Sequence, residues 1–121
     1  MKRYVRSVDT FNIPEENKHG DCFVQALNQF MKDPGHTTVV HGVVTGRGAI
    51  EGLQYCHAWA EVGDEVIDNT LPESLRRLPQ DAYYRLANVI FTKKYGYREV
   101  LENVVKYETY GPWDKAFEGY P

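Results

Sequence analysis

Leu53 to Asn69 reads LQYCHAWAEVGDEVIDN, and this stretch decides the fold because it encodes one β-hairpin. The runs on both sides of Gly63-Asp64 contain the β-branched and aromatic residues typical of strands. The Gly-Asp dipeptide itself suits a two-residue turn. The sequence therefore predicts strands over residues 53–62 and 65–69, joined at Gly63-Asp64.

His57 and Asp68 come close together in this hairpin. With Gly63-Asp64 as the turn, Trp59 lies opposite Asp68, and His57 is the diagonal neighbour of Asp68 on the same face. Diagonal neighbours are about 7 Å apart at the backbone. At that separation a carboxylate can accept the proton of one imidazole nitrogen and leave the other nitrogen as a base. The hairpin thus predicts a His57–Asp68 dyad, with Tyr55 and Glu61 on the same face.

An amphipathic helix precedes the hairpin, since apolar residues recur at helical spacing after Gly20. Asp21 is a suitable N-cap, and Asp33-Pro34-Gly35 a suitable end. The other expected elements are a strand over 37–45, a loop with one helical turn over 72–79, a strand over 83–92, and a helix over 97–107 that turns Val100, Leu101, Val104 and Val105 inward. A helix, then an antiparallel sheet, then another helix is an α+β layout.

Cys22 lies in the first turn of the expected helix, on the flank of its apolar stripe. Free amide donors and the helix dipole favour an anion at that position. Cys22, His57 and Asp68 therefore suggest a thiol nucleophile, its base, and the carboxylate that orients the base. The amide of Cys22 could also donate to a developing oxyanion. Such a constellation performs acyl transfer.

Composition limits the other classes of function. The chain has 121 residues, enough for one domain, and a net charge of −3 from interspersed acidic and basic residues. That pattern argues against binding of nucleic acid or anionic lipid. No run has the length of a signal peptide core or of a membrane span, so we expect a soluble, cytoplasmic protein with both cysteines reduced.

Three segments of the chain carry a family resemblance. Gly20-Asp21-Cys22 at a helix start, His57-Ala58-Trp59 with Glu61 on a strand, and Val66-Ile67-Asp68 on the partner strand resemble the transglutaminase-like branch of the papain-like cysteine enzymes. The resemblance covers residues 20–70. Within that branch, residues 39–68 are similar to lasso-peptide leader peptidases and to small phage proteins, which would place a phage-encoded chain in the host cytoplasm.

The resemblance implies a single transglutaminase-like domain over residues 1–121, with a nucleophile helix packed on an antiparallel sheet. It implies a Cys-His-Asp triad acting on a peptide or protein substrate through a thioester, with no cofactor or metal. Papain-type peptidases place a glutamine before the cysteine as an oxyanion donor, whereas this chain has Glu15 and Glu16 there and offers only Asn17 or His19.

Other interpretations remain open at this level. The same site could serve a transglutaminase or deamidase, or the triad could be inactive in a binding module that engages a host protein through Tyr-rich surfaces. Cys56 is expected to be structural because it points away from the face of His57, which also argues against zinc held by the two cysteines and His57. Glu61, Lys93 and Lys94 are expected to be solvated. Substrate specificity is expected from the loops 46–52 and 72–79.

Overall fold

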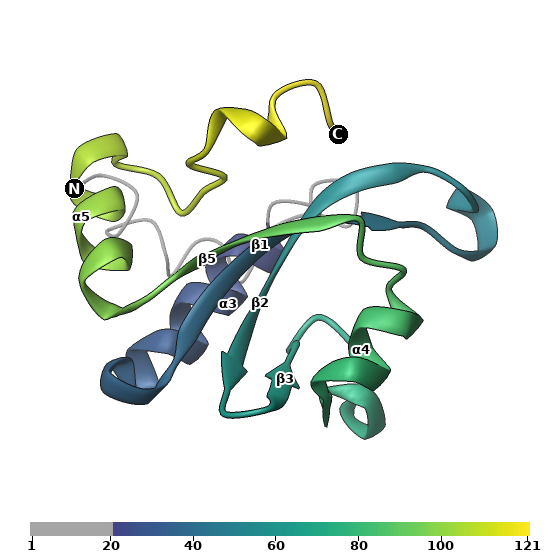
Figure 1. The fold of residues 1–121 in the computed structure, drawn as a ribbon, viewed down its shortest axis with the longest axis horizontal. Helices are drawn as coiled ribbons and strands as arrows, with labels where there is room; N and C mark the ends of the chain where they lie inside the picture. Colours follow the sequence, from purple (N-terminus) through teal and green to yellow (C-terminus); the bar gives the residue numbers. More distant parts are fainter. Residues whose placement is uncertain (1–20) are drawn as a thin grey trace.

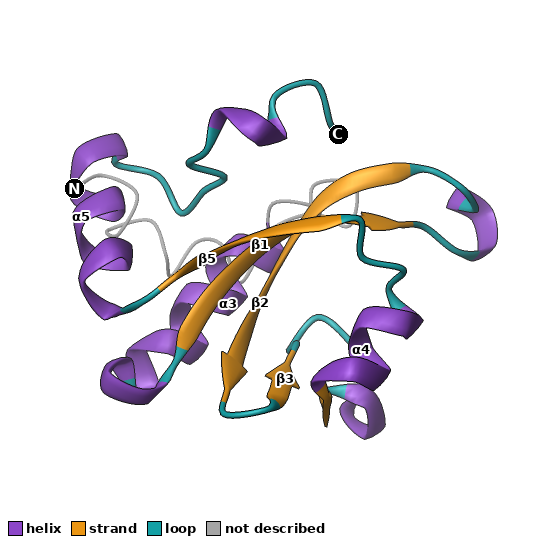
Figure 2. Cartoon of the chain, in the orientation of Figure 1, coloured by secondary structure: helices purple, strands orange, loops and turns teal. Residues whose placement is uncertain are grey.

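A five-stranded antiparallel sheet forms the centre of the structure, a computed structural model that describes residues 21–121 (Figures 1 and 2). The strands lie in the order β4-β3-β2-β1-β5, and their bounds are β1 Thr38–Thr45, β2 Gln54–Val62, β3 Glu65–Ile67, β4 Arg77–Pro79 and β5 Phe91–Tyr95. Together with the helices this is the expected α+β class. Within the described residues, no helix has the length and apolar character to cross a bilayer.

Helix α3, Asp21–Lys32, packs on one face of the sheet. The predicted end before Asp33 is confirmed, but Asp21 is already helical rather than the cap, and its carboxylate accepts a hydrogen bond from Gln25. The helix buries its apolar stripe against inward residues of β1 and β2, among them Val43 and Ala58. The expectations for Asn17, His19 and Gly20 lie outside the described residues.

The opposite face of the sheet is covered by helix α4, Gln80–Leu86. The strand predicted over residues 83–92 is therefore wrong over residues 83–90, and β5 begins only at Phe91. The reason is tertiary packing: Tyr83 is buried against Trp59, with ring centroids 5.1 Å apart. The helical conformation directs Tyr83 toward the sheet, and this packing outweighs the β-propensity of the local sequence.

Helix α5, Tyr97–Tyr107, follows β5 and confirms the last predicted helix. Val100 and Val104 are buried as expected, but Val105 is 73% exposed. Consecutive residues are 100° apart around a helix, so Val105 lies outside the stripe that its neighbour occupies. The segment after α5, yellow in Figure 1, returns to the α3 side and buries Tyr110, Trp113 and Phe117 there.

The hairpin that carries the candidate site has the predicted turn. Val62 pairs with Glu65, and the pairing continues only to Ala60 and Ile67. β3 therefore ends earlier than predicted, and Asp68 is not paired with Trp59 but donates its backbone N–H to the carbonyl of Arg76. As a result, the part of β2 that contains His57 lies beyond the end of β3, where other segments can reach it.

Candidate active site

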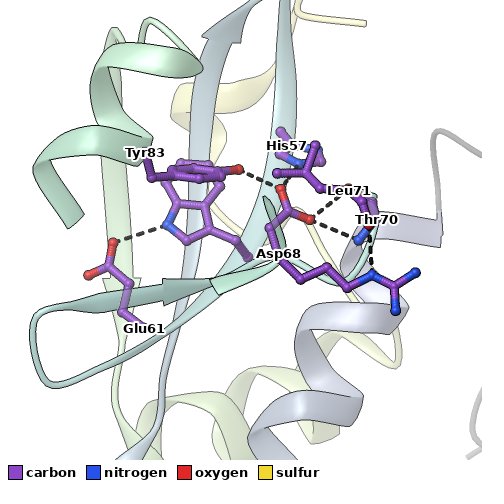
Figure 3. A network of polar contacts seen from close by, with 8 residues as sticks. His57, Glu61, Asp68, Thr70, Leu71 and Tyr83 are labelled. Atoms are coloured by element: carbon purple, nitrogen blue, oxygen red, sulfur yellow. Dashed lines mark hydrogen bonds and ion pairs between the residues drawn. The ribbon is translucent and has the colours of Figure 1, made fainter. Parts of the chain in front are cut away.

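His57 and Asp68 form the centre of a buried polar network (Figure 3). The imidazole Nε2 of His57 lies 2.8 Å from Oδ2 of Asp68. The side chain of His57 is 14% exposed and that of Asp68 only 2%. The predicted dyad is thus present in the structure, and it keeps one edge of the imidazole near solvent. On the neighbouring strand β1, Gly42 is paired with His57.

Asp68 is held by four hydrogen bonds. Oδ2 accepts from His57 and, at 2.6 Å, from the Tyr83 hydroxyl, while Oδ1 accepts from the amide and hydroxyl of Thr70 at 3.0 and 2.6 Å. Burial alone would raise the pKa of Asp68, but the bond and charge of His57, with smaller help from Thr70 and Tyr83, lower it below its usual 3.8. Asp68 is therefore an ionised carboxylate in a fixed orientation.

Thr70 and Tyr83 were missed as site residues by the sequence reasoning. Thr70 had a local signal, because an aspartate two residues before a threonine commonly accepts that residue's N–H in a turn. Tyr83 had none, since the segment that contains it was assigned to a strand. Only the packing of α4 on the sheet brings the Tyr83 hydroxyl to the aspartate.

Cys22 reaches the same imidazole from α3. The side chains of Cys22 and His57 form a hydrogen bond, and since Nε2 is occupied by Asp68, Nδ1 is the nitrogen that remains for the thiol. A second link fixes the helix to the end of the hairpin: the Asn69 amide donates to Oε1 of Gln29 at 3.0 Å. The structure therefore brings together all three residues that the sequence singled out.

The electrostatics of the site favour a charged imidazole. Burial lowers the pKa of His57, but the hydrogen bond of Asp68, followed by the bond and charge of Cys22 and the charge of Asp68, raises it overall to about 10. Tyr55 stands beside this group, 6.1 Å from His57 between ring centroids. Burial raises the pKa of Tyr55, and the charges of Cys22 and Asp68 raise it further. Tyr55 is thus an uncharged side chain that borders the site.

Cys56 belongs to the core rather than to the site, in agreement with the sequence. It is 8% exposed in the apolar cluster beneath α3, and burial, with a smaller effect of Cys22, raises its pKa to about 12. No disulfide joins the two cysteines. Within residues 21–121, no group of three or more His, Cys, Asp or Glu side chains is arranged to hold a metal ion.

A second polar network, around Glu61, lies next to the site. The expectation that Glu61 is solvated is therefore wrong. Glu61 is 6% exposed and accepts from Trp59 Nε1 at 3.0 Å, from the Tyr84 hydroxyl at 2.6 Å and from Lys94 at 3.0 Å. Lys94 is consequently ion-paired, not merely solvated as predicted. The network fixes the Trp59 ring, which packs 6.0 Å from that of His57 between centroids.

Comparison of the chain with models of protein families, with curated proteins and with solved structures found no match. The interpretation of the site therefore depends on its own geometry.

Proposed function

We propose that the chain is a cysteine-dependent acyl-transfer enzyme of the papain-like, transglutaminase-like kind, and within that class a peptidase or amidase. One observation carries the proposal: a single imidazole is hydrogen-bonded to a thiol from one element and to a buried carboxylate from another. Thr70 and Tyr83 already donate hydrogen bonds to Asp68, so a purely structural role for this carboxylate would not require His57 as well. A histidine shared between a carboxylate and a thiol is instead typical of a catalytic site.

The roles follow from the order of contacts. Sγ of Cys22 attacks the carbonyl carbon of an amide, a C–S bond forms, and the C–N bond breaks as the imidazolium of His57 transfers its proton to the leaving amine. The neutral imidazole then removes a proton from water, which attacks the thioester and releases the acid and the thiolate. Asp68 holds the ring in orientation and stabilises its charged form throughout.

Developing negative charge on the carbonyl oxygen needs a hydrogen-bond donor, and the backbone N–H of Cys22 is the candidate. Cys22 is the second residue of α3, and the backbone N–H groups of a first helical turn have no acceptor within the helix. An oxyanion near this N–H would also gain from the positive end of the helix dipole. This arrangement allows the nucleophile and the oxyanion donor to belong to the same residue.

The test is the alkylation of Cys22 by iodoacetamide, followed by mass spectrometry of the modified peptides. At pH 6 an ordinary thiol with a pKa of about 8.5 is only about 0.3% thiolate and reacts slowly. We expect Cys22 to react much faster than that, and to slow by about tenfold or more in His57→Gln and His57→Ala variants. Cys56 is the internal control: both cysteines are buried, but burial raises the pKa of Cys56 to about 12, so it should stay a thiol at pH 6 and react only after unfolding.

Circular dichroism of each variant verifies that the fold is retained. Slow alkylation of Cys22 in the folded wild-type protein, at the rate of an ordinary buried thiol, would remove the proposed function and leave a binding module as the interpretation of this fold.

A further inference from the structure

A pocket of about 330 Å³ lies directly beside the His57–Asp68 pair. Its floor comes from the sheet, with Val44 and Tyr55, and its far wall comes from Leu86 and Ala87 at the end of α4. The loops 46–52 and 72–79, from which the sequence predicted specificity, supply the rim through Arg47, Ile50 and Leu75. The pocket is thus mainly apolar and has room for a side chain rather than for a folded partner.

The position of the pocket relates it to one side of the reaction. Cys22 lies in the cluster under α3, whereas the pocket opens on the other face of the sheet, and Cys22 is not among its lining residues. The imidazole of His57 lines the pocket and is also hydrogen-bonded to the thiol, so it links the two. Since that imidazole donates its proton to the leaving amine, the groups attached to the amine are the ones nearest to the pocket.

Arg47 gives the pocket a charge preference. Its Nε donates to the Leu86 carbonyl at 2.8 Å, which holds the exposed guanidinium at the rim. Among residues 21–121, no carboxylate forms an ion pair with Arg47. The terminal nitrogens of the guanidinium are therefore left to bind an anion, and a carboxylate is the anion that its planar donor pair fits.

We propose that the pocket binds the leaving-group side of the substrate, with an aliphatic side chain among the apolar residues and a carboxylate at Arg47. The carboxylate is either the free α-carboxylate of the residue that is released or the side chain of an acidic residue that follows it. The assignment to the leaving group rests on the proposed function of Cys22 and His57. The binding preference itself does not, and it is measurable without the thiol.

The experiment is titration of the Cys22→Ala protein with N-acetyl-leucine, followed by NMR of the leucine methyl groups. In this probe the acetyl carbonyl stands for the attacked acyl group. We expect shifts at Leu75 and Leu86, and binding at least tenfold tighter than that of N-acetyl-alanine, because the larger side chain buries more apolar surface. Replacing the carboxylate by an amide should weaken binding about threefold or more.

Two pairs of variants isolate the two parts of the pocket. Arg47→Glu should abolish the preference for the carboxylate over the amide, whereas Arg98→Glu, an equal change of charge on α5 outside the pocket, should retain it. Leu75→Asp should weaken the leucine probe, whereas Leu53→Asp should not, although the two leucines are similarly exposed at 38% and 42%.

Comparison of N-acetyl-leucine with N-acetyl-leucyl-glutamate amide identifies the source of the carboxylate. Tighter binding of the first indicates a free α-carboxylate, and tighter binding of the second an acidic residue that follows. Absence of binding by every probe, shifts remote from the pocket, or equal effects of each variant and its control would overturn the inference. None of these results would affect the alkylation rate of Cys22. The binding preference of the pocket and the proposed chemistry are therefore tested independently.

Discussion

Acidification should destabilise the protein through one buried histidine on β1. His41 is 0% exposed, and the rings of Phe23, Tyr95 and Trp113 surround it at centroid distances of 5.0, 5.0 and 4.8 Å. Neither ring nitrogen has a hydrogen-bond partner in the described part of the chain. Burial therefore lowers the pKa of His41 from 6.5 to about 3, because a charged imidazolium would lose its hydration without compensation.

The magnitude follows from the difference in bound protons between the two states. Above pH 6.5 His41 is neutral both folded and unfolded, and its contribution to stability is complete. Below pH 6.5 the unfolded chain gains a proton there that the folded protein does not, until the folded pKa of about 3 is reached. The free energy of unfolding should therefore fall by up to about 1.4 kcal/mol per pH unit, and by about 1.6 kcal/mol between pH 6.5 and 5.0, because the unfolded histidine is already half protonated at pH 6.5.

The active-site residues do not obscure this slope. The pKa of His57 is raised in the folded protein, so its contribution between pH 6.5 and 5.0 is small and of opposite sign, and it is the same in the His41→Leu variant and in the control. The pKa of Asp68 is lowered below 3.8, and its stabilising effect is lost only at more acidic pH. The comparison is made in a Cys22→Ala background, which keeps the thiol out of the measurement.

The assay is urea unfolding in this background at pH 6.5 and 5.0, followed by tryptophan fluorescence. His41→Leu should remove the difference of about 1.6 kcal/mol between the two pH values. His36→Leu is the control, because the side chain of His36 is 80% exposed and the acid destabilisation should persist there. If His41→Leu retains the full pH dependence, the buried neutral histidine is not its cause and the reasoning is refuted.

Two further predictions concern the packing and the orientation of the site. Gly42→Ala should lower the free energy of unfolding by about 2 kcal/mol in thermal melts, because its Cβ would lie 2.6 Å from Cη2 of Trp59, whereas Gly35→Ala, with nothing within 4 Å, should change little. Equal effects of the two would contradict the close packing. Tyr83→Phe removes a hydroxyl bond to the buried aspartate and should slow alkylation of the thiol at pH 6 about three- to tenfold. Tyr84→Phe, whose hydroxyl bonds elsewhere, should leave the rate unchanged, and a similar loss in both would assign the effect to general loosening.

Local sequence patterns were sufficient for the elements that carry the triad. Helix α3, the strands β1 and β2 and the turn at Gly63-Asp64 were predicted, because their periodicity and turn chemistry act over a few neighbouring residues. The contact between His57 and Asp68 was predictable for the same reason, since a hairpin converts sequence spacing into distance. The meeting of Cys22 with His57 was predicted from the residue types and from the resemblance to a family, because no local spacing joins the helix to the hairpin.

Long-range packing decided the rest. Tyr83 became helical and bonded to Asp68 because α4 covers the second face of the sheet, a contact that no local pattern in its segment encodes. Glu61 is buried rather than solvated because two distant donors, Tyr84 and Lys94, join the nearby Trp59 in binding its carboxylate. The pocket beside His57 exists only where two loops and α4 meet. Spacing along a chain determines which face a side chain occupies, but what covers that face depends on segments dozens of residues away, and only the tertiary structure brings those together.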